Sequence, residues 1–175
     1  ADGMVIDLSC LAKEIDNQEL LRDTRVEVDL SKIAYNMQQI RGMSGPDVAV
    51  MPVIKANGYG HGAAAIAPTL LEEGAVYLAV ATLTEALELK DKDTSWPVFI
   101  LGHTPDRLLH HIVEREITQT IFSLEQAQIL SRLASETGKT AKVHIKVDTG
   151  FHRLGKVPSQ EFADEVCEMF KLPCL

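Results

Sequence analysis

The chain contains the stretch Met51-Pro52-Val53-Ile54-Lys55-Ala56-Asn57-Gly58-Tyr59-Gly60-His61-Gly62, in which a lysine ends an apolar run. Such a run, closed by glycines, is typical of a buried strand that leads into a loop. A lysine at the end of a buried strand loses part of its solvation, which favours the neutral amine that can form an imine with an aldehyde. The glycines let the backbone approach a ligand closely, and Tyr59 offers a phenolic donor. The stretch predicts a site of covalent cofactor attachment; the alternative is a solvated lysine beside an ordinary turn.

Beyond this stretch, short runs rich in β-branched or aromatic residues alternate with segments of helical period. The predicted strands are Val48 to Lys55, Tyr77 to Ala81, Pro97 to Leu101, Thr118 to Phe122 and Val143 to Asp148. The predicted helices are His61 to Glu73, Thr84 to Lys90, Pro105 to Glu116, Ser123 to Thr137 and Ser159 to Lys171. Repeated units of this kind indicate right-handed βαβ crossovers and a parallel sheet. Either a doubly wound open sheet or a (β/α)8 barrel is compatible, and both place ligands at the carboxyl ends of strands.

The amino-terminal part follows a different pattern. Residues 1–24 form an arm of unknown role with a short amphipathic pattern that suggests a helix. Residues 25–30 alternate like a half-exposed strand, and Ser31 is the expected cap of a helix that Gly42 to Pro46 terminates. Two later helices begin with the spacing of a capping box, Thr82 with Glu85 and Ser123 with Gln126.

A second informative stretch is Val143-His144-Ile145-Lys146-Val147-Asp148-Thr149-Gly150-Phe151-His152-Arg153-Leu154-Gly155. Alternation puts His144, Lys146 and Asp148 on one face of the predicted strand. Because buried polar groups need hydrogen-bond partners, we expect these side chains to form a mutual network. The alternative is a structural ion network around Asp148 and Arg153.

The first stretch closely resembles the pyridoxal-phosphate attachment motif of the alanine racemase family. In that family, the lysine at the position of Lys55 is bound covalently to the cofactor and serves as a catalytic base. The tyrosine at the position of Tyr59 hydrogen-bonds the cofactor phosphate. The resemblance therefore implies pyridoxal 5'-phosphate as the cofactor, with Lys55 as the catalytic residue.

The second stretch resembles the other signature of the same family, a lysine followed by Asp-Thr-Gly and an arginine. The resemblance implies that Arg153 lies beside the cofactor and the substrate carboxylate, with Asp148 in a supporting role. In many members the lysine at the position of Lys146 carries a carbamate that holds the arginine, and we hypothesise the same for Lys146, since a desolvated lysine supplies the neutral amine. Phe151 and His152 depart from the family pattern beside Arg153, and they leave the choice of amino acid open.

The resemblance selects the barrel and implies an incomplete one. We expect residues 25–175 to be the first part of a pyridoxal-phosphate barrel, with about five of eight strands, and the family's β-rich second domain to be absent. In the family, the base on the opposite face is a tyrosine from the second domain of a partner subunit. We therefore expect a parent protein that is a homodimer, and an isolated chain that is catalytically silent.

Composition narrows the classes of function. The net charge is −8, and 46% of residues are apolar while 5% are aromatic, a balance that argues against nucleic acid and anionic membranes. The cysteines, Cys10, Cys167 and Cys174, show neither disulfide nor zinc spacing, so we expect a cytoplasmic protein. No metal is predicted: His103, His110 and His111 lack a ligand pattern, and the last two should point to different faces of their helix. The charges from Lys90 to Asp93 are interpreted as solvated, and His61 as a cap.

The resemblance implies that the parent protein is an amino-acid racemase, and we expect it to interconvert L- and D-alanine for the supply of cell-wall precursors. Two alternatives remain. A serine or broad-specificity racemase would share both motifs. A non-catalytic pyridoxal-phosphate-binding barrel is the alternative outside enzymes, but such proteins differ around their lysine and lack the second motif.

Overall fold

The computed structural model describes residues 5–7 and 26–175 of the chain. A short antiparallel pair of strands, β1 (Val5–Asp7) and β2 (Glu27–Asp29), precedes the first described helix, α2 (Leu30–Ser44). Apart from this pair, the predicted arm of residues 1–24 lies outside the described residues, as does Cys10.

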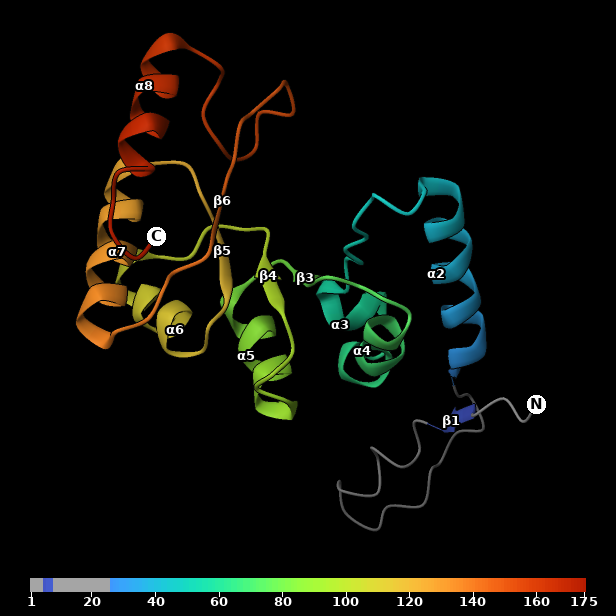
Figure 1. Cartoon of the computed structure of the whole chain (residues 1–175). Coiled ribbons are helices and arrows are strands. Elements are labelled where there is room, and N and C mark those ends of the chain that lie inside the picture. The colour runs from blue at the N-terminus through green and yellow to red at the C-terminus, as the bar shows by residue number, and fades with distance from the viewer. Residues whose placement is uncertain (1–4, 8–25) are drawn as a thin grey trace.

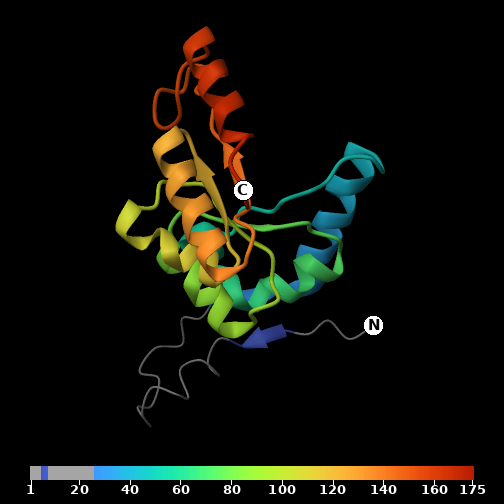
Figure 2. The same cartoon turned by 60° about the vertical axis from the view of Figure 1, so that its left-hand side comes forward.

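The rest of the chain alternates helices and strands in the predicted order, with two differences: the predicted strand at 48–55 forms only an isolated bridge at Val53, and the short helix that begins at Lys55 was not predicted. The elements are α3 (Lys55–Tyr59), α4 (Ala63–Glu72), β3 (Leu78–Val80), α5 (Leu83–Lys92), β4 (Val98–Ile100), the 3-10 turn η1 (Asp106–Leu108), α6 (Leu109–Glu114), β5 (Thr118–Ile121), α7 (Leu124–Thr137), β6 (Val143–Ile145) and α8 (Gln160–Met169). Strands β3 to β6 form a parallel sheet in sequence order. Figures 1 and 2 show the strands side by side, with α5, α6 and α7 packed along them.

A fifth parallel segment extends this sheet before β3. Residues 50–54 pair with the chain around β3 through three backbone hydrogen bonds: Val76 N to Val50 O (3.0 Å), Ala79 N to Pro52 O (2.9 Å) and Ile54 N to Ala79 O (2.8 Å). Five successive parallel segments joined by helices are the beginning of a (β/α)8 barrel, as predicted, and not a doubly wound sheet, whose strand order would reverse.

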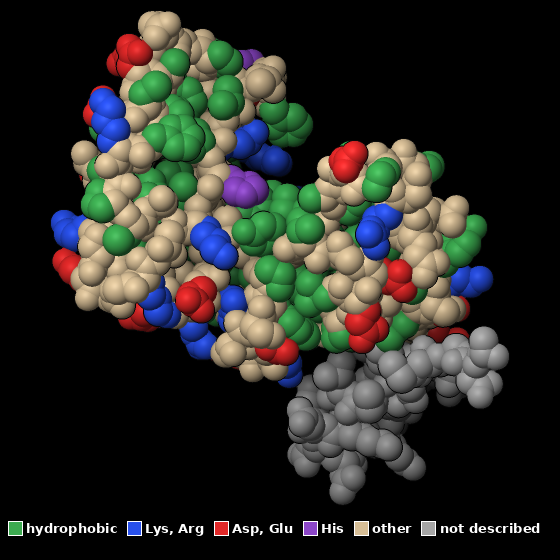
Figure 3. All heavy atoms as spheres, in the orientation of Figure 1, with side chains coloured by type: hydrophobic (Ala, Val, Ile, Leu, Met, Phe, Trp, Pro, Cys, Tyr) green, Lys and Arg blue, Asp and Glu red, His purple; other side chains and the backbone are tan. Residues whose placement is uncertain are grey.

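Alternate residues of the strands face opposite sides. Leu78 and Val80 of β3, like Val98 and Ile100 of β4, belong to the core that the helices cover. The residues between them, such as Phe99, point to the other face, where Phe99 contacts Tyr77 and His144. That second face is the one that lines the interior of a barrel. Figure 3 shows apolar side chains gathered in the hollow between the part of the molecule that carries α6 to α8 and the part that carries α2 and α4.

The helix ends follow capping chemistry. Thr82 and Glu85 form the predicted capping box at the start of α5, and Ser123 caps α7 by accepting from the Gln126 amide. The prediction of Ser31 as a cap is wrong: the carboxylate of Asp29 accepts from the amides of Ser31 and Lys32, so the cap lies two residues earlier than predicted. An ionised carboxylate is at least as good a cap as a hydroxyl, and it complements the helix dipole.

Within the described residues, no helix is both long enough and apolar enough to cross a membrane.

Candidate cofactor site

Lys55 lies where the sequence predicted it, at the carboxyl end of a parallel segment. It directly follows Ile54, which is buried and bonded to β3, and its own side chain is half-buried. The carboxyl ends of parallel strands are where barrels hold their ligands. Lys55 therefore lies at the end of the sheet where barrels of this class bind ligands.

The residues after Lys55 form a left-handed turn, which the glycine pattern predicted only in part. Positive φ values run without interruption from Ala56 (52°) through Asn57 (53°), Gly58 (64°) and Tyr59 (53°) to Gly60 (89°). Glycine adopts this conformation freely, but alanine, asparagine and tyrosine do so at a cost. Consecutive non-glycine residues of this kind store strain, which proteins commonly place at functional sites.

Hydrogen bonds inside the stretch hold the turn closed. Gly58 N donates to Ile54 O at 2.7 Å, and Gly62 N donates to Asn57 O at 2.9 Å. The Asn57 side chain accepts from Ala63 N at 2.8 Å, at the first residue of α4. His61, expected as a helix cap, instead places Nδ1 2.9 Å from Gly58 O, because the helix begins two residues later than predicted.

One residue that holds this turn was missed from the sequence. The carboxylate of Glu85, on α5, accepts the backbone N–H of Ala56 at 2.7 Å. The capping-box spacing revealed that Glu85 begins a helix, but spacing along the chain carries no information about contact with a residue 29 positions earlier.

Tyr59 projects from the turn and is 63% exposed. Together with Gly58, His61 and Ile54 it lines an apolar hollow of about 430 Å³ between α2, α4 and the segment 50–54. The phenol is therefore accessible to a ligand at this end of the sheet.

The second stretch departs from expectation. Strand β6 ends at Ile145, and Lys146 is exposed, with Nζ donating to the Val147 carbonyl at 3.3 Å. The side chain of Lys146 is therefore in contact with solvent, and the expected desolvation is wrong. His144 packs against Phe99 at a ring distance of 4.3 Å, so the predicted mutual network of His144, Lys146 and Asp148 is wrong.

Asp148 is buried, and its carboxylate accepts hydrogen bonds from the loop that follows it. Its Oδ1 accepts the backbone amides of Gly150, Phe151 and His152, each at 3.0 Å. The His152 amide, followed by that of Gly150, lowers the pKa of the Asp148 carboxyl, against the opposing effect of burial. The alternative interpretation, an ion network that joins Asp148 to Arg153, is also wrong. Arg153 contacts the Phe151 ring, with Cζ 4.7 Å from the ring centroid.

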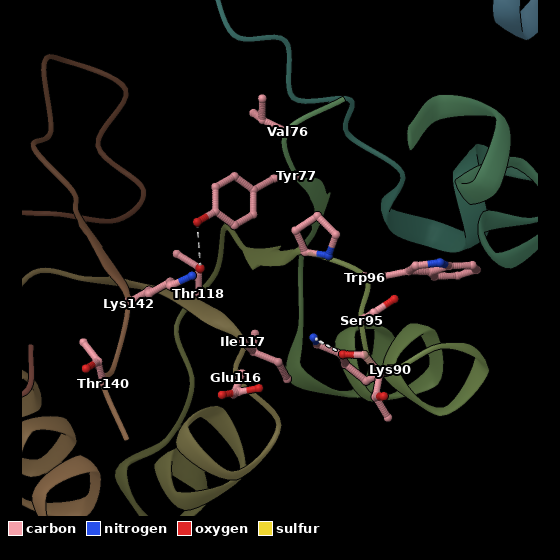
Figure 4. A pocket seen from close by; sticks show the side chains of 12 residues that line it. Val76, Tyr77, Lys90, Ser95, Trp96, Glu116, Ile117, Thr118, Thr140 and Lys142 are labelled. Carbon is pink, nitrogen blue, oxygen red and sulfur yellow. Dashed lines mark hydrogen bonds between the residues drawn. The ribbon is translucent and has the colours of Figure 1, made fainter. Parts of the chain in front are cut away.

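A second hollow lies at the opposite, amino-terminal end of the strands (Figure 4). It measures about 410 Å³, and the side chains that line it include Tyr77, Lys90, Trp96, Glu116 and Lys142. The interpretation of Lys90 as a solvated charge is wrong, since it is 3% exposed and donates to the Thr94 carbonyl at 2.8 Å. Burial lowers the pKa of Lys90. Because Lys55 lies at the other end of the sheet, this hollow is separate from the candidate site around Lys55.

The histidines of α6 lie closer together than predicted. The rings of His110 and His111 contact each other, with centroids 4.0 Å apart and an interplanar angle of 39°, and His111 Nδ1 is 3.7 Å from Glu114 Oε2. The expectation that the two rings point to different faces is therefore wrong. His103 contacts the Gln126 amide at 3.0 Å.

Fold and site together define a parallel α/β chain of the barrel class that presents a lysine at the carboxyl end of its first parallel segment, directly before a left-handed turn. The family model described as alanine racemase, N-terminal domain, matches residues 28–175. The chain belongs to the alanine racemase family.

Individual relatives agree with this assignment. The chain is 46% identical to an alanine racemase of Clostridium perfringens over 153 residues, which are 87% of this chain and 39% of the relative. Its structure resembles alanine racemase from Bacillus anthracis with bound L-Ala-P (TM-score 0.76, 33% identity, 88% of this chain and 39% of that one). It also resembles histidine racemase from Leuconostoc mesenteroides (TM-score 0.69, 30% identity, 81% of this chain and 37% of that one). The chain thus spans about two-fifths of the length of these relatives.

Proposed function

We propose that this chain is the cofactor-bearing part of a pyridoxal-phosphate-dependent amino-acid racemase, with Lys55 as the attachment residue and catalytic base. The observation that carries the proposal is the position of Lys55, at the carboxyl end of a parallel segment and directly before a left-handed turn, in a chain of the alanine racemase family. Residues 25–175 are proposed as the first part of the barrel, and L- and D-alanine as the substrates of the whole enzyme, in the supply of cell-wall precursors.

The residues present fit pyridoxal 5'-phosphate. A half-buried primary amine suits an aldehyde, the exposed phenol of Tyr59 suits a phosphate, and Gly60, which has nothing within 4 Å of its Cβ position, leaves space for a ligand to approach the backbone. When bound, the cofactor delocalises the negative charge that develops at the substrate Cα. Lys55 would then hold or release a proton on one face of that carbon.

The second stretch is proposed to bind the substrate. Arg153 is exposed, and its guanidinium can hold a carboxylate through two parallel hydrogen bonds. The Asp148 turn fixes the loop that carries it. We retain the carbamate of Lys146 as a hypothesis that rests on the family resemblance, since the exposed side chain lacks the desolvation that would favour a neutral amine. Intact mass under bicarbonate tests it: a gain of one carbon dioxide at Lys146 supports the carbamate, and an unmodified amine contradicts it.

The remaining groups that racemisation needs are proposed to come from other parts of the whole enzyme. A proton donor is required on the opposite face of the substrate, and we propose that a second subunit of a homodimer supplies it. We place the enzyme in the cytoplasm, in keeping with the two exposed free thiols, Cys167 and Cys174.

The test is borohydride reduction of the chain after incubation with pyridoxal phosphate, followed by peptide mapping. The adduct is expected on Lys55 and absent from Lys55→Ala, while Lys32, an exposed lysine on α2, provides the level of nonspecific labelling. An adduct found only at exposed lysines would refute the proposal. A non-catalytic cofactor-binding barrel remains the outcome if Lys55 is labelled and the full-length enzyme racemises nothing.

The substrate is open to a second candidate. The resemblance to a histidine racemase, together with Phe151 and His152 beside Arg153, favours a broader choice of amino acid than alanine alone. Full-length enzyme tested with alanine, serine and histidine decides between them. A rate with alanine at least tenfold above the others supports alanine racemase.

A further inference from the structure

The carboxylate of Glu85 joins three backbone N–H groups from two separate parts of the chain. Oε1 accepts from Ala56 at 2.7 Å. Oε2 accepts from Ala81 at 2.7 Å and from Thr82 at 3.2 Å. The side chain therefore connects the residue after Lys55 to the carboxyl end of β3.

Capping of α5 requires only one of these bonds. In a capping box the third helical residue accepts the N–H of the N-cap residue, here Thr82, and that bond is the longest of the three. A glutamine would serve a capping box as well as a glutamate. The two shorter bonds, to Ala56 and Ala81, lie outside the capping box and use the full charge and both oxygens of a carboxylate.

Ala56 has particular need of this acceptor. The carbonyl of Pro52, four positions earlier, accepts from Ala79 N at 2.9 Å across the sheet, and the Ala56 amide donates to Glu85 instead. Ala56 is also the first residue of the left-handed turn, with φ at 52°. A strained conformation persists only when its surroundings fix it, and the Glu85 carboxylate is the side-chain contact that fixes the start of this turn.

We infer that Glu85 is a positioning residue for Lys55: its carboxylate sets the direction in which the lysine leaves the sheet by holding the next peptide N–H against β3. The inference rests on the proposed role of Lys55 as the attachment residue. Glu85 touches neither substrate nor cofactor in this arrangement, and it acts through the backbone of the turn.

The competing explanation is that Glu85 stabilises α5 alone, and two control variants separate the explanations. Thr82→Ala removes the hydroxyl that caps Glu85 N and weakens the helix start, but it leaves the carboxylate in place. Glu88→Ala removes an exposed carboxylate from the same helix. Glu85→Ala removes all three bonds. Glu85→Gln keeps the size of the side chain but sets an NH2 group against a backbone N–H.

The first measurement is amide hydrogen exchange in the chain without cofactor. Exchange at Ala56 is expected to accelerate about tenfold or more in Glu85→Ala, which is the factor for losing one charge-assisted hydrogen bond. In Glu85→Gln the NH2 group replaces one of the two oxygens, so exchange is expected to accelerate at Ala56 or at Ala81, whichever amide faces the NH2 group. Thr82→Ala and Glu88→Ala should leave Ala56 unchanged. Equal exchange at Ala56 in Glu85→Ala, Glu85→Gln and the unsubstituted chain overturns the inference.

The second measurement reports the orientation of the bound cofactor. After borohydride trapping at Lys55, the induced circular dichroism per bound cofactor is expected to fall in both Glu85 variants and to persist in Thr82→Ala and Glu88→Ala. If the unsubstituted chain traps no cofactor at Lys55, the proposed function fails, and this inference fails with it. If trapping and dichroism are the same in all variants, the inference alone fails.

Discussion

Gly102 lies directly against the carbonyl oxygen of Ala81: a Cβ at position 102 would be 2.3 Å from that oxygen. The contact brings the chain after β4 against the chain after β3. It lies at the carboxyl end of the strands, where Lys55 also lies. The backbone at Gly102 has no left-handed φ, so it is space and not conformation that requires glycine here.

We therefore expect Gly102→Ala to destabilise the fold by about 2 kcal/mol or more, because two backbones must separate. Urea unfolding measures the loss. Gly42→Ala is the matched control, since nothing lies within 4 Å of its Cβ and it occupies α2. That control should gain up to about 1 kcal/mol. Equal midpoints for the two variants would contradict the close contact.

Ala56→Gly should stabilise the chain. A left-handed conformation costs an alanine about 1–2 kcal/mol, and the greater freedom of unfolded glycine offsets about 0.5–1 kcal/mol of the relief. The net expectation is a gain of about 0.5–1 kcal/mol in the free energy of unfolding.

The same substitution in an ordinary helix should have the opposite sign. Ala163 is exposed, like Ala56, but lies inside right-handed α8. Ala163→Gly is expected to lose about 0.5–1 kcal/mol. A loss at both positions would show that Ala56 is not strained in solution.

Glu165 ties α8 to α7. Its Oε1 accepts the N–H of Leu124 at 2.7 Å, and Oε2 pairs with Lys156. The Lys156 ammonium, followed by the Leu124 amide, lowers the pKa of the Glu165 carboxyl. Glu165→Ala should cost about 2 kcal/mol, the range for a hydrogen bond to a charged group. Thermal or urea unfolding measures it. Glu161→Ala, in the exposed first turn of α8, should cost a few tenths, about what an exposed charge at a helix start contributes.

The Asp148 loop should weaken in acid. Because the pKa of Asp148 is lowered in the folded chain, its ionised form stabilises the fold above the unfolded pKa of about 3.9, and this contribution is lost as pH falls through the folded pKa. Urea midpoints measured from pH 6 to pH 2.5 should therefore fall less in Asp148→Asn than in the unsubstituted chain. Parallel curves would contradict the assignment. Other carboxyls with lowered pKa, such as Asp29, are common to both proteins and cancel in the difference.

The order of elements could be predicted from sequence because each depends on local pattern. Hydrophobic period and cap spacing located α5 and α7 closely, since the signals that begin those helices lie within three residues of one another. The cap of α2 was misplaced by choosing Ser31 over Asp29, two residues with similar intrinsic preference for that position. The lysine position followed from the same local reasoning, since a strand end lies next to its own loop.

Long-range contacts could not be predicted, because no local pattern encodes them. Lys90 lies in a run of alternating charges, yet it is buried and donates to the Thr94 carbonyl in the loop that follows its helix. Alternation suggested a shared network for Lys146 and Asp148, but the strand ends at Ile145 and the period of two ends with it. The carboxylate of Asp148 instead accepts three backbone amides that lie within the next four residues of the chain.

The turn after Lys55 is close to the mirror image of an ordinary helical turn. Its backbone shape is the one that residues of inverted chirality adopt without strain. A chain assembled by ligation with a D-residue at position 56 would therefore keep the turn and relieve its strain, whereas the same inversion in α7 would break a helix. The peptide that follows Lys55 thus has the stereochemical preference of the opposite enantiomer.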